Sequence, residues 1–120
     1  MLNALIEKAA ISLLAGEPAP TRVPTDSGLP HDIHRCPDCA TALWSDYGGR
    51  PNIGFVRVTT LDEPGALAPD VHIFVRSKLP WVVLPEATPH FDAYYDLRSL
   101  WPAASWARLQ AARAQSGARG

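Results

Sequence analysis

The sequence predicts a mainly β fold that ends in one helix. The chain contains 12 prolines in 120 residues, about twice the usual share, which favours many turns and few long helices. Apolar residues alternate most clearly over residues 53–60, as is typical of a strand. Pro102 precedes a stretch rich in alanine, arginine and glutamine, so residues 103–115 are the one long segment expected to form a helix.

In the N-terminal half, Asn3 is expected to cap a short turn over residues 5–8. Four short strands are expected to follow, at residues 11–14, 21–25, 32–35 and 43–47. The turn residues Asp26, Ser27 and Gly28 should join the second and third of these strands into a hairpin. The third strand then leads directly into Cys36.

In the C-terminal half, the strand at residues 53–60 is expected to contain a bulge, because the apolar positions change parity between Phe55 and Val56. A turn at residues 62–65 and an irregular crossover with at most one helical turn should follow. Residues 71–76 look like a strand, and residues 78–85, with proline near both ends, like an ordered loop or sheet edge. Gly117 is expected to end the helix.

Length and charge limit the classes of function. A chain of this size buries about two-thirds of its unfolded surface, so residues 1–120 are expected to form a single domain with its own core. The net charge of -1 gives no case for nucleic acid or an anionic membrane as a partner. The apolar stretch at residues 9–15 is too short to span a bilayer, so a cytoplasmic location is expected.

The segment Cys36-Pro37-Asp38-Cys39 is the most specific motif in the chain, and it contains both cysteines. Its Cys-Pro-x-Cys spacing is typical of a zinc knuckle, in which two thiolates point at one metal ion. In a reducing compartment such a pair is a metal site or two free thiols, rather than a structural disulfide. A thioredoxin-like role is not expected, because a strand and not a helix should follow the motif.

Two thiolates do not complete a tetrahedral zinc site, so further ligands are needed. His34 is the first candidate, because it precedes Cys36 by two residues and projects from the same face of the strand. His31 would reach only if the turn folds back, and a symmetric dimer would instead join two knuckles into one four-thiolate site. The alternative is that Cys36 and Cys39 are reduced thiols without metal and that both histidines are ordinary surface residues.

Three motifs in order indicate a family. They are residues 34–41 around the two cysteines, residues 55–64 and residues 72–81, and they are extended by Leu84-Pro85 and Pro89-His90-Phe91. Together they resemble the glutathione-dependent formaldehyde-activating enzymes and their centromere protein V relatives. The resemblance implies a β-tent, a fold of small antiparallel sheets pinned by zinc.

The resemblance also implies a chemistry, the reversible joining of formaldehyde to the glutathione thiol by a carbon-sulfur lyase. In the family, Cys36 and Cys39 would match one half of a structural zinc site, and separate N-terminal cysteines would complete it and hold a catalytic zinc. This sequence has neither N-terminal motif, which implies a shortened start, no competent catalytic zinc and no assigned catalytic residue. Ala40 also replaces the usual glycine after the knuckle, a position that often needs a positive φ.

The third motif suggests a ligand site. Arg76, Lys78 and Trp81 could bind the carboxylates of a glutathione-like molecule. The alternative, which we favour, is that Trp81 is buried in the core and the two cations are solvated. His72 is expected to be packed within a strand, and the other tryptophans are expected to pack as well.

Three functions follow from the sequence. The first is a β-tent domain with a zinc knuckle but no catalytic zinc, the second an active lyase with a metal site rebuilt from His34, His31 or a partner chain. The third is a non-catalytic module that forms homodimers through an uncovered apolar face.

Overall fold

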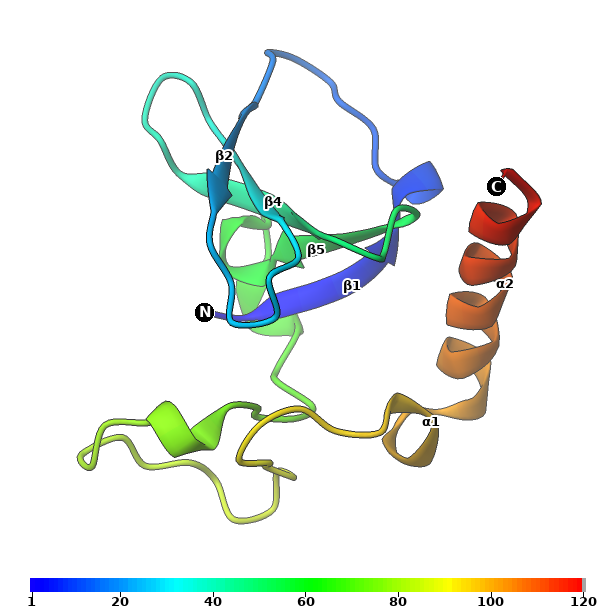
Figure 1. Ribbon diagram of the computed structural model, residues 1–120. Coiled ribbons are helices and arrows are strands. Elements are labelled where there is room, and N and C mark those ends of the chain that lie inside the picture. The colour runs from blue at the N-terminus through cyan, green and yellow to red at the C-terminus, as the bar shows by residue number, and fades with distance from the viewer. Residues whose placement is uncertain (120) are drawn as a thin grey trace.

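A computed structural model describes the backbone of residues 1–119 and the side chains of residues 1–115. Five strands form one antiparallel sheet in the spatial order β1-β5-β4-β3-β2 (Figure 1). The strands are β1 (Asn3–Glu7), β2 (Ala19–Val23), β3 (His31–Arg35), β4 (Ala42–Tyr47) and β5 (Ile53–Arg57). The helices are α1 (Leu97–Leu100) and α2 (Ala103–Arg119). The prediction of a mainly β chain with a C-terminal helix is confirmed.

Strands β2, β3 and β4 form close to where the local sequence predicts strands. Gly28 has a φ of 80°, and its N–H donates to the carbonyl of Thr25, which closes the turn between β2 and β3. The strands expected at residues 32–35 and 43–47 lie within β3 and β4, and the one expected at 21–25 overlaps β2. These strands bring the two cysteines to the tip of the β3–β4 hairpin.

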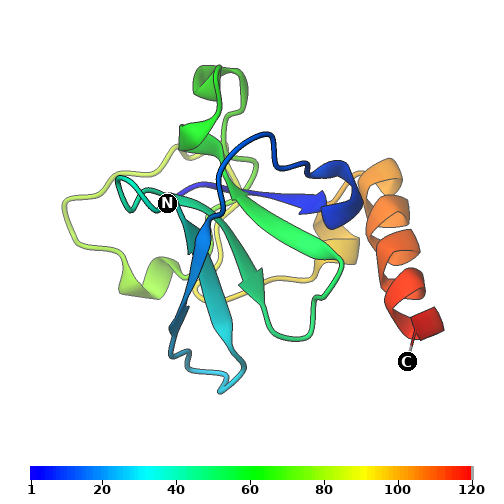
Figure 2. The same cartoon turned by 90° about the horizontal axis from the view of Figure 1, so that it is seen from above.

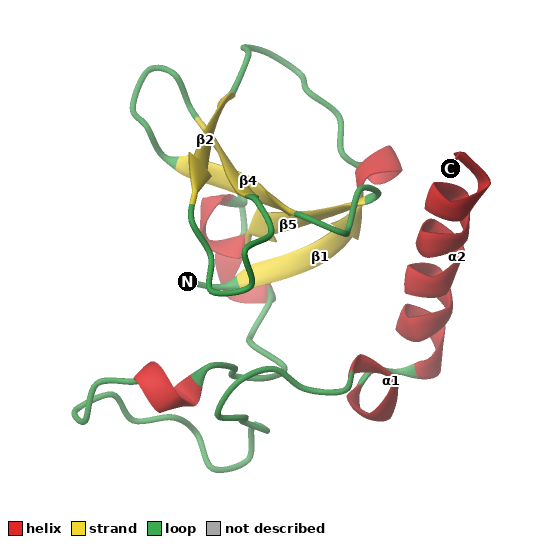
Figure 3. Cartoon of the chain, viewed as in Figure 1, coloured by secondary structure: helices red, strands yellow, loops and turns green. Residues whose placement is uncertain are grey.

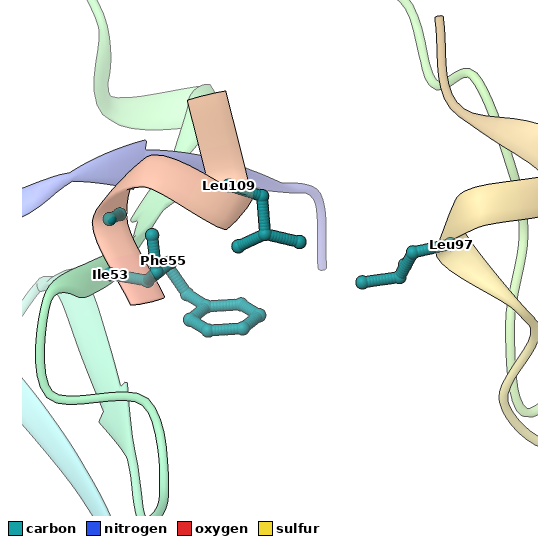
Figure 4. Close-up of a cluster of buried hydrophobic side chains, with 5 residues drawn as sticks. Ile53, Phe55, Leu97 and Leu109 are labelled. Carbon is teal, nitrogen blue, oxygen red and sulfur yellow. The ribbon is translucent and has the colours of Figure 1, made fainter. Parts of the chain in front are cut away.

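The core lies between the sheet and the helices. Alternate residues of β5, Ile53 and Phe55, are buried against Leu109 and Ala112 of α2 and Leu97 of α1. Figure 4 shows Leu109 beside Ile53 and Phe55, while Leu97 comes from a separate segment. Burying each large side chain of this kind contributes about 1.5–3 kcal/mol, so these contacts hold the helices to the sheet.

Helix α2 lies beside the β1 edge of the sheet, as the views in Figures 1 and 2 agree. An ion pair crosses this boundary, with Arg108 Nη2 of α2 2.9 Å from Glu7 Oε2 of β1. Glu7 is the last residue of β1, so the pair fixes one end of the edge strand to the helix.

The chain between β5 and α1 is largely irregular (Figure 3). Its described regular elements are three single turns of 3₁₀ helix and one isolated parallel bridge between His72 and His90. The turns are Val58–Thr60, Pro64–Ala66 and Val75–Ser77. The second turn confirms the expectation of at most one helical turn in the crossover, and residues 78–85 form a loop as expected.

The prediction for the first 14 residues was wrong. Residues 5–8 were expected to form a turn and residues 11–14 a strand, but β1 occupies Asn3–Glu7 and residues 11–14 have no regular structure. Residues 3–7 form a strand because they pair with β5, with Asn3 opposite Arg57 and Glu7 opposite Ile53. This pairing joins segments that are far apart in the sequence. Local residue preferences do not contain that information.

The strand expected at residues 71–76 was also wrong. Phe74 has a φ of 53°, in the left-handed region, which no continuous strand adopts. The N–H of His72 donates to the carbonyl of Pro89, and the N–H of Phe74 to that of Ala93. The backbone N–H groups of this segment therefore find their hydrogen-bond acceptors in residues 89–93, a second irregular segment, instead of in the sheet.

Two element ends and the position of a bulge differ from expectation. Strand β5 ends at Arg57, and residues 58–60 form the 3₁₀ turn instead of its last residues. The bulge expected between Phe55 and Val56 is not there, because the β1–β5 register is continuous, and the register shift lies between His34 and Arg35. Gly117 does not end α2, which continues to Arg119.

Within residues 1–119, no helix has the length and apolar character needed to cross a membrane.

Candidate functional site

The tip of the β3–β4 hairpin is a closed turn that carries both cysteines. The N–H of Cys36 donates to the carbonyl of Thr41 at 2.9 Å, and the N–H of Ala40 donates to the carbonyl of Cys36 at 2.8 Å. Ala40 has a φ of 63°, so the positive φ expected at this position is present although the residue is not glycine. The backbone thus holds Cys36 and Cys39 at one turn.

The two thiols are free and differ in their surroundings. Cys36 is half-buried and Cys39 is exposed. The sulfur of Cys39 lies 3.1 Å from the hydroxyl oxygen of Thr41. Hydrogen bonds from the Thr41 side chain and backbone, and then from the Cys36 side chain, lower the pKa of the Cys39 thiol. Cys39 is therefore an exposed thiol whose ionised form is stabilised by its neighbours.

His34 is not directed to the thiols. Its ring stacks on Trp44 with the centroids 4.4 Å apart, and its Nε2 lies 2.8 Å from Asp46 Oδ2. The other oxygen of Asp46 lies 3.0 Å from Lys8 Nζ. His34 thus belongs to a polar cluster on the sheet face opposite the helices, with Asp46 between two basic groups.

His31 is also committed elsewhere, on the helix-facing side of the sheet. It is 8% exposed, its Nε2 lies 2.8 Å from Ser45 Oγ, and its ring stacks on Tyr47 at 4.1 Å. Burial, followed by the nearby charge of Arg57, lowers the pKa of His31, although Asp32 acts in the opposite direction. His31 is therefore a neutral, packed residue at neutral pH.

The donor set does not fit a closed zinc site within one chain. Among residues 1–119, no three side chains of histidine, cysteine, aspartate or glutamate gather closely enough to hold a metal ion. Structural zinc takes four ligands and catalytic zinc three plus an open position. The hairpin tip supplies two.

The cluster proposed from the third motif is spread over a loop. Lys78 Nζ donates to the carbonyl of Val82 at 2.8 Å, so it ties its own loop together, and Arg76 lies over the Phe74 ring at 5.7 Å. The expectation that Trp81 is a core residue was wrong, because Trp81 is 75% exposed. Trp101 and Trp106 do pack against the core, as expected.

Sequence reasoning missed a groove of about 690 Å³ along β1. Strand β1, α2 and residues 67–71 line it, and most of its walls are apolar, including Leu5, Ile6 and Trp101. The groove follows the free edge of the sheet, since β1 is a terminal strand. The pairing that creates this edge joins distant segments, so no local pattern could have indicated it.

A comparison with models of known protein families gives a match. The family model described as glutathione-dependent formaldehyde-activating enzyme matches residues 1–77. No curated protein and no solved structure matches the chain. The matched region contains all five strands and both cysteines, and it covers more than half of the sequence. The chain therefore belongs to the glutathione-dependent formaldehyde-activating enzyme family.

Proposed function

We propose that this chain is a β-tent domain of its family that keeps the cysteine knuckle but has no competent catalytic zinc site of its own. The observation that supports the proposal is the donor set: among the residues that the structure describes, no third metal-ligating side chain gathers with Cys36 and Cys39 at the hairpin tip. A lyase of this family needs an ion with fixed ligands and an open position to polarise formaldehyde or to lower the pKa of the glutathione thiol.

Rebuilding the site from the nearby histidines would be costly. His34 would have to leave both Trp44 and Asp46, and Asp46 would lose one of its two partners. Leaving a part-buried carboxylate oxygen without its hydrogen-bond partner costs more than such a hydrogen bond contributes net to stability. His31 would have to leave a buried hydrogen bond to Ser45.

The test is the rate of formation of S-(hydroxymethyl)glutathione from formaldehyde and glutathione, measured by NMR exchange with the protein, with and without added zinc. We expect no acceleration over the same concentration of free zinc. Acceleration that disappears in both Cys36→Ser and Cys39→Ser would contradict the proposal and support an active lyase with a rebuilt metal site.

A second function, a homodimeric interaction module, is favoured by the exposed apolar surface. Three alternate residues of one loop, Leu79, Trp81 and Val83, are 54%, 75% and 89% exposed. The free β1 edge and its apolar groove form another uncovered surface. A net charge of -1 gives little repulsion between two copies.

Sedimentation equilibrium over a range of concentrations tests this second function. A dimer that weakens in Trp81→Ser but not in Leu14→Ser would support it. Leu14 is the matched control because it is 96% exposed and lies outside the loop. A monomer at every concentration would exclude the homodimer.

A further inference from the structure

We propose that the hairpin tip binds one two-coordinate cuprous ion per chain, held by the sulfurs of Cys36 and Cys39. The starting point is the mismatch between the hairpin tip and zinc. Zinc favours four tetrahedral ligands, whereas the described residues gather only two there. The inference concerns metal selectivity and does not depend on whether the chain has lyase activity.

The two thiols belong to the same closed turn and are both free. The side chain of Cys36 is among the groups that act on the Cys39 thiol, so the two side chains are neighbours. The turn is fixed by its two backbone hydrogen bonds, from Cys36 to Thr41 and from Ala40 to Cys36. Because Cys39 is exposed, an ion can reach the pair directly from solvent.

The ligand chemistry selects a soft ion. Thiolates favour cuprous copper among the available metals, and a monovalent ion with a filled d shell is stable with two ligands, unlike zinc. On binding, both S–H bonds break, two protons leave to solvent, and two copper–sulfur bonds form while copper stays cuprous. The product carries one negative charge.

The turn carries charges of both signs. Arg35 Nη1 donates to the carbonyl of Ala40 at 3.2 Å, which places a guanidinium on the turn itself. The negative side chain of Asp38 acts on the Cys39 thiol. The bis-thiolate product thus forms on a turn that carries one cation as well as one anion.

Neither neighbouring histidine is needed as a third ligand. His34 bonds to Asp46 and His31 to Ser45, each at 2.8 Å. A two-ligand site therefore leaves both contacts intact. A third ligand taken from either histidine would break one of them.

The test is a competition titration of the reduced protein under argon, with cuprous ion supplied by a coloured cuprous chelator. We expect one copper per chain, with no change in the mass of the particle when copper binds. Cys36→Ser and Cys39→Ser should each weaken binding by more than the roughly 10 to 100-fold that loss of an outer partner of a metal site costs. His34→Ala is the matched control and should bind copper like the original chain.

Circular dichroism of each serine variant checks that the sheet is retained, so loss of binding cannot be mistaken for unfolding. Three results would overturn the inference. They are no copper binding to the folded chain, copper binding that survives both serine substitutions, and tighter zinc binding at half an ion per chain in a dimer. The last result would mean that two copies share one four-thiolate site.

Discussion

Ser45 Oγ and His31 Nε2 lie 2.8 Å apart inside the sheet, and their contact belongs to a polar row that crosses four strands. Arg57 Nη2 donates to the same serine oxygen at 2.9 Å, and Arg57 Nη1 donates to Asn3. Ser45 is 0% exposed and Arg57 7%. A buried guanidinium is thus held by neutral acceptors, and Ser45 is the residue that joins it to His31.

Ser45→Ala should therefore destabilise the protein by about 1–3 kcal/mol, because Arg57 and His31 would each lose a buried partner. Chemical denaturation, followed by tryptophan fluorescence, measures this free energy of unfolding. Ser12→Ala is the control, since Ser12 is exposed and lies outside regular structure. Equal stability of the two variants would show that the polar row contributes nothing.

Stability should also fall as the pH drops below the ordinary histidine pKa of 6.5. The folded state holds the pKa of His31 below that value, so the unfolded chain binds more protons between the two pKa values, and stability rises with pH there. Protonated His31 would stand beside Arg57, and the Ser45 hydroxyl would lose its acceptor.

Asp32 acts in the opposite direction on His31 but does not reverse the shift. Denaturation midpoints at a series of pH values measure the effect, and His31→Gln keeps an acceptor for Ser45 without a titrating group. The slope near pH 6 should disappear in this variant. An unchanged slope would assign the pH dependence to another group.

Much of the fold could be predicted because its signals are local. Gly28 marks the β2–β3 turn and Pro102 the start of α2, and both act through their own backbone geometry. Strand β1 and the crossing of residues 72–75 with residues 89–93 could not be predicted, because both are set by partners far along the chain. Strand pairing is decided by packing, not by residue preference.

In the candidate functional site too, local features could be predicted from the sequence and contacts between strands could not. The Cys36–Cys39 turn could be identified from its spacing, and the positive φ of Ala40 from its place after the knuckle. The stacking of His34 on Trp44 and its contact with Asp46 could not be predicted, because both partners come from the neighbouring strand. Same-face periodicity put His34 near Cys36, but cross-strand partners decide what its ring contacts.

Gly48→Ala should destabilise the protein by about 1–3 kcal/mol, through crowding and not through φ. An added Cβ would lie 2.7 Å from Pro30 Cδ and 3.0 Å from Leu29 Cβ, neither of which can move like the end of a flexible side chain. Gly65→Ala is the matched control, because nothing lies within 4 Å of its added Cβ. Thermal unfolding of both variants measures the difference, and a comparable loss in Gly65→Ala would contradict the crowding argument.

Ala40→Gly should stabilise the protein by up to about 1 kcal/mol. A residue with a Cβ in the left-handed region, as Ala40 is at a φ of 63°, costs about 1–2 kcal/mol, and this exceeds the extra entropy of about 0.5–1 kcal/mol that glycine loses on folding. Ala42→Gly is the control, because Ala42 opens β4 in extended backbone and should only lose stability. The comparison is made by chemical denaturation of the reduced protein. If Ala40→Gly lost as much stability as Ala42→Gly, the strained turn that presents Cys36 and Cys39 would have to be relaxed in solution.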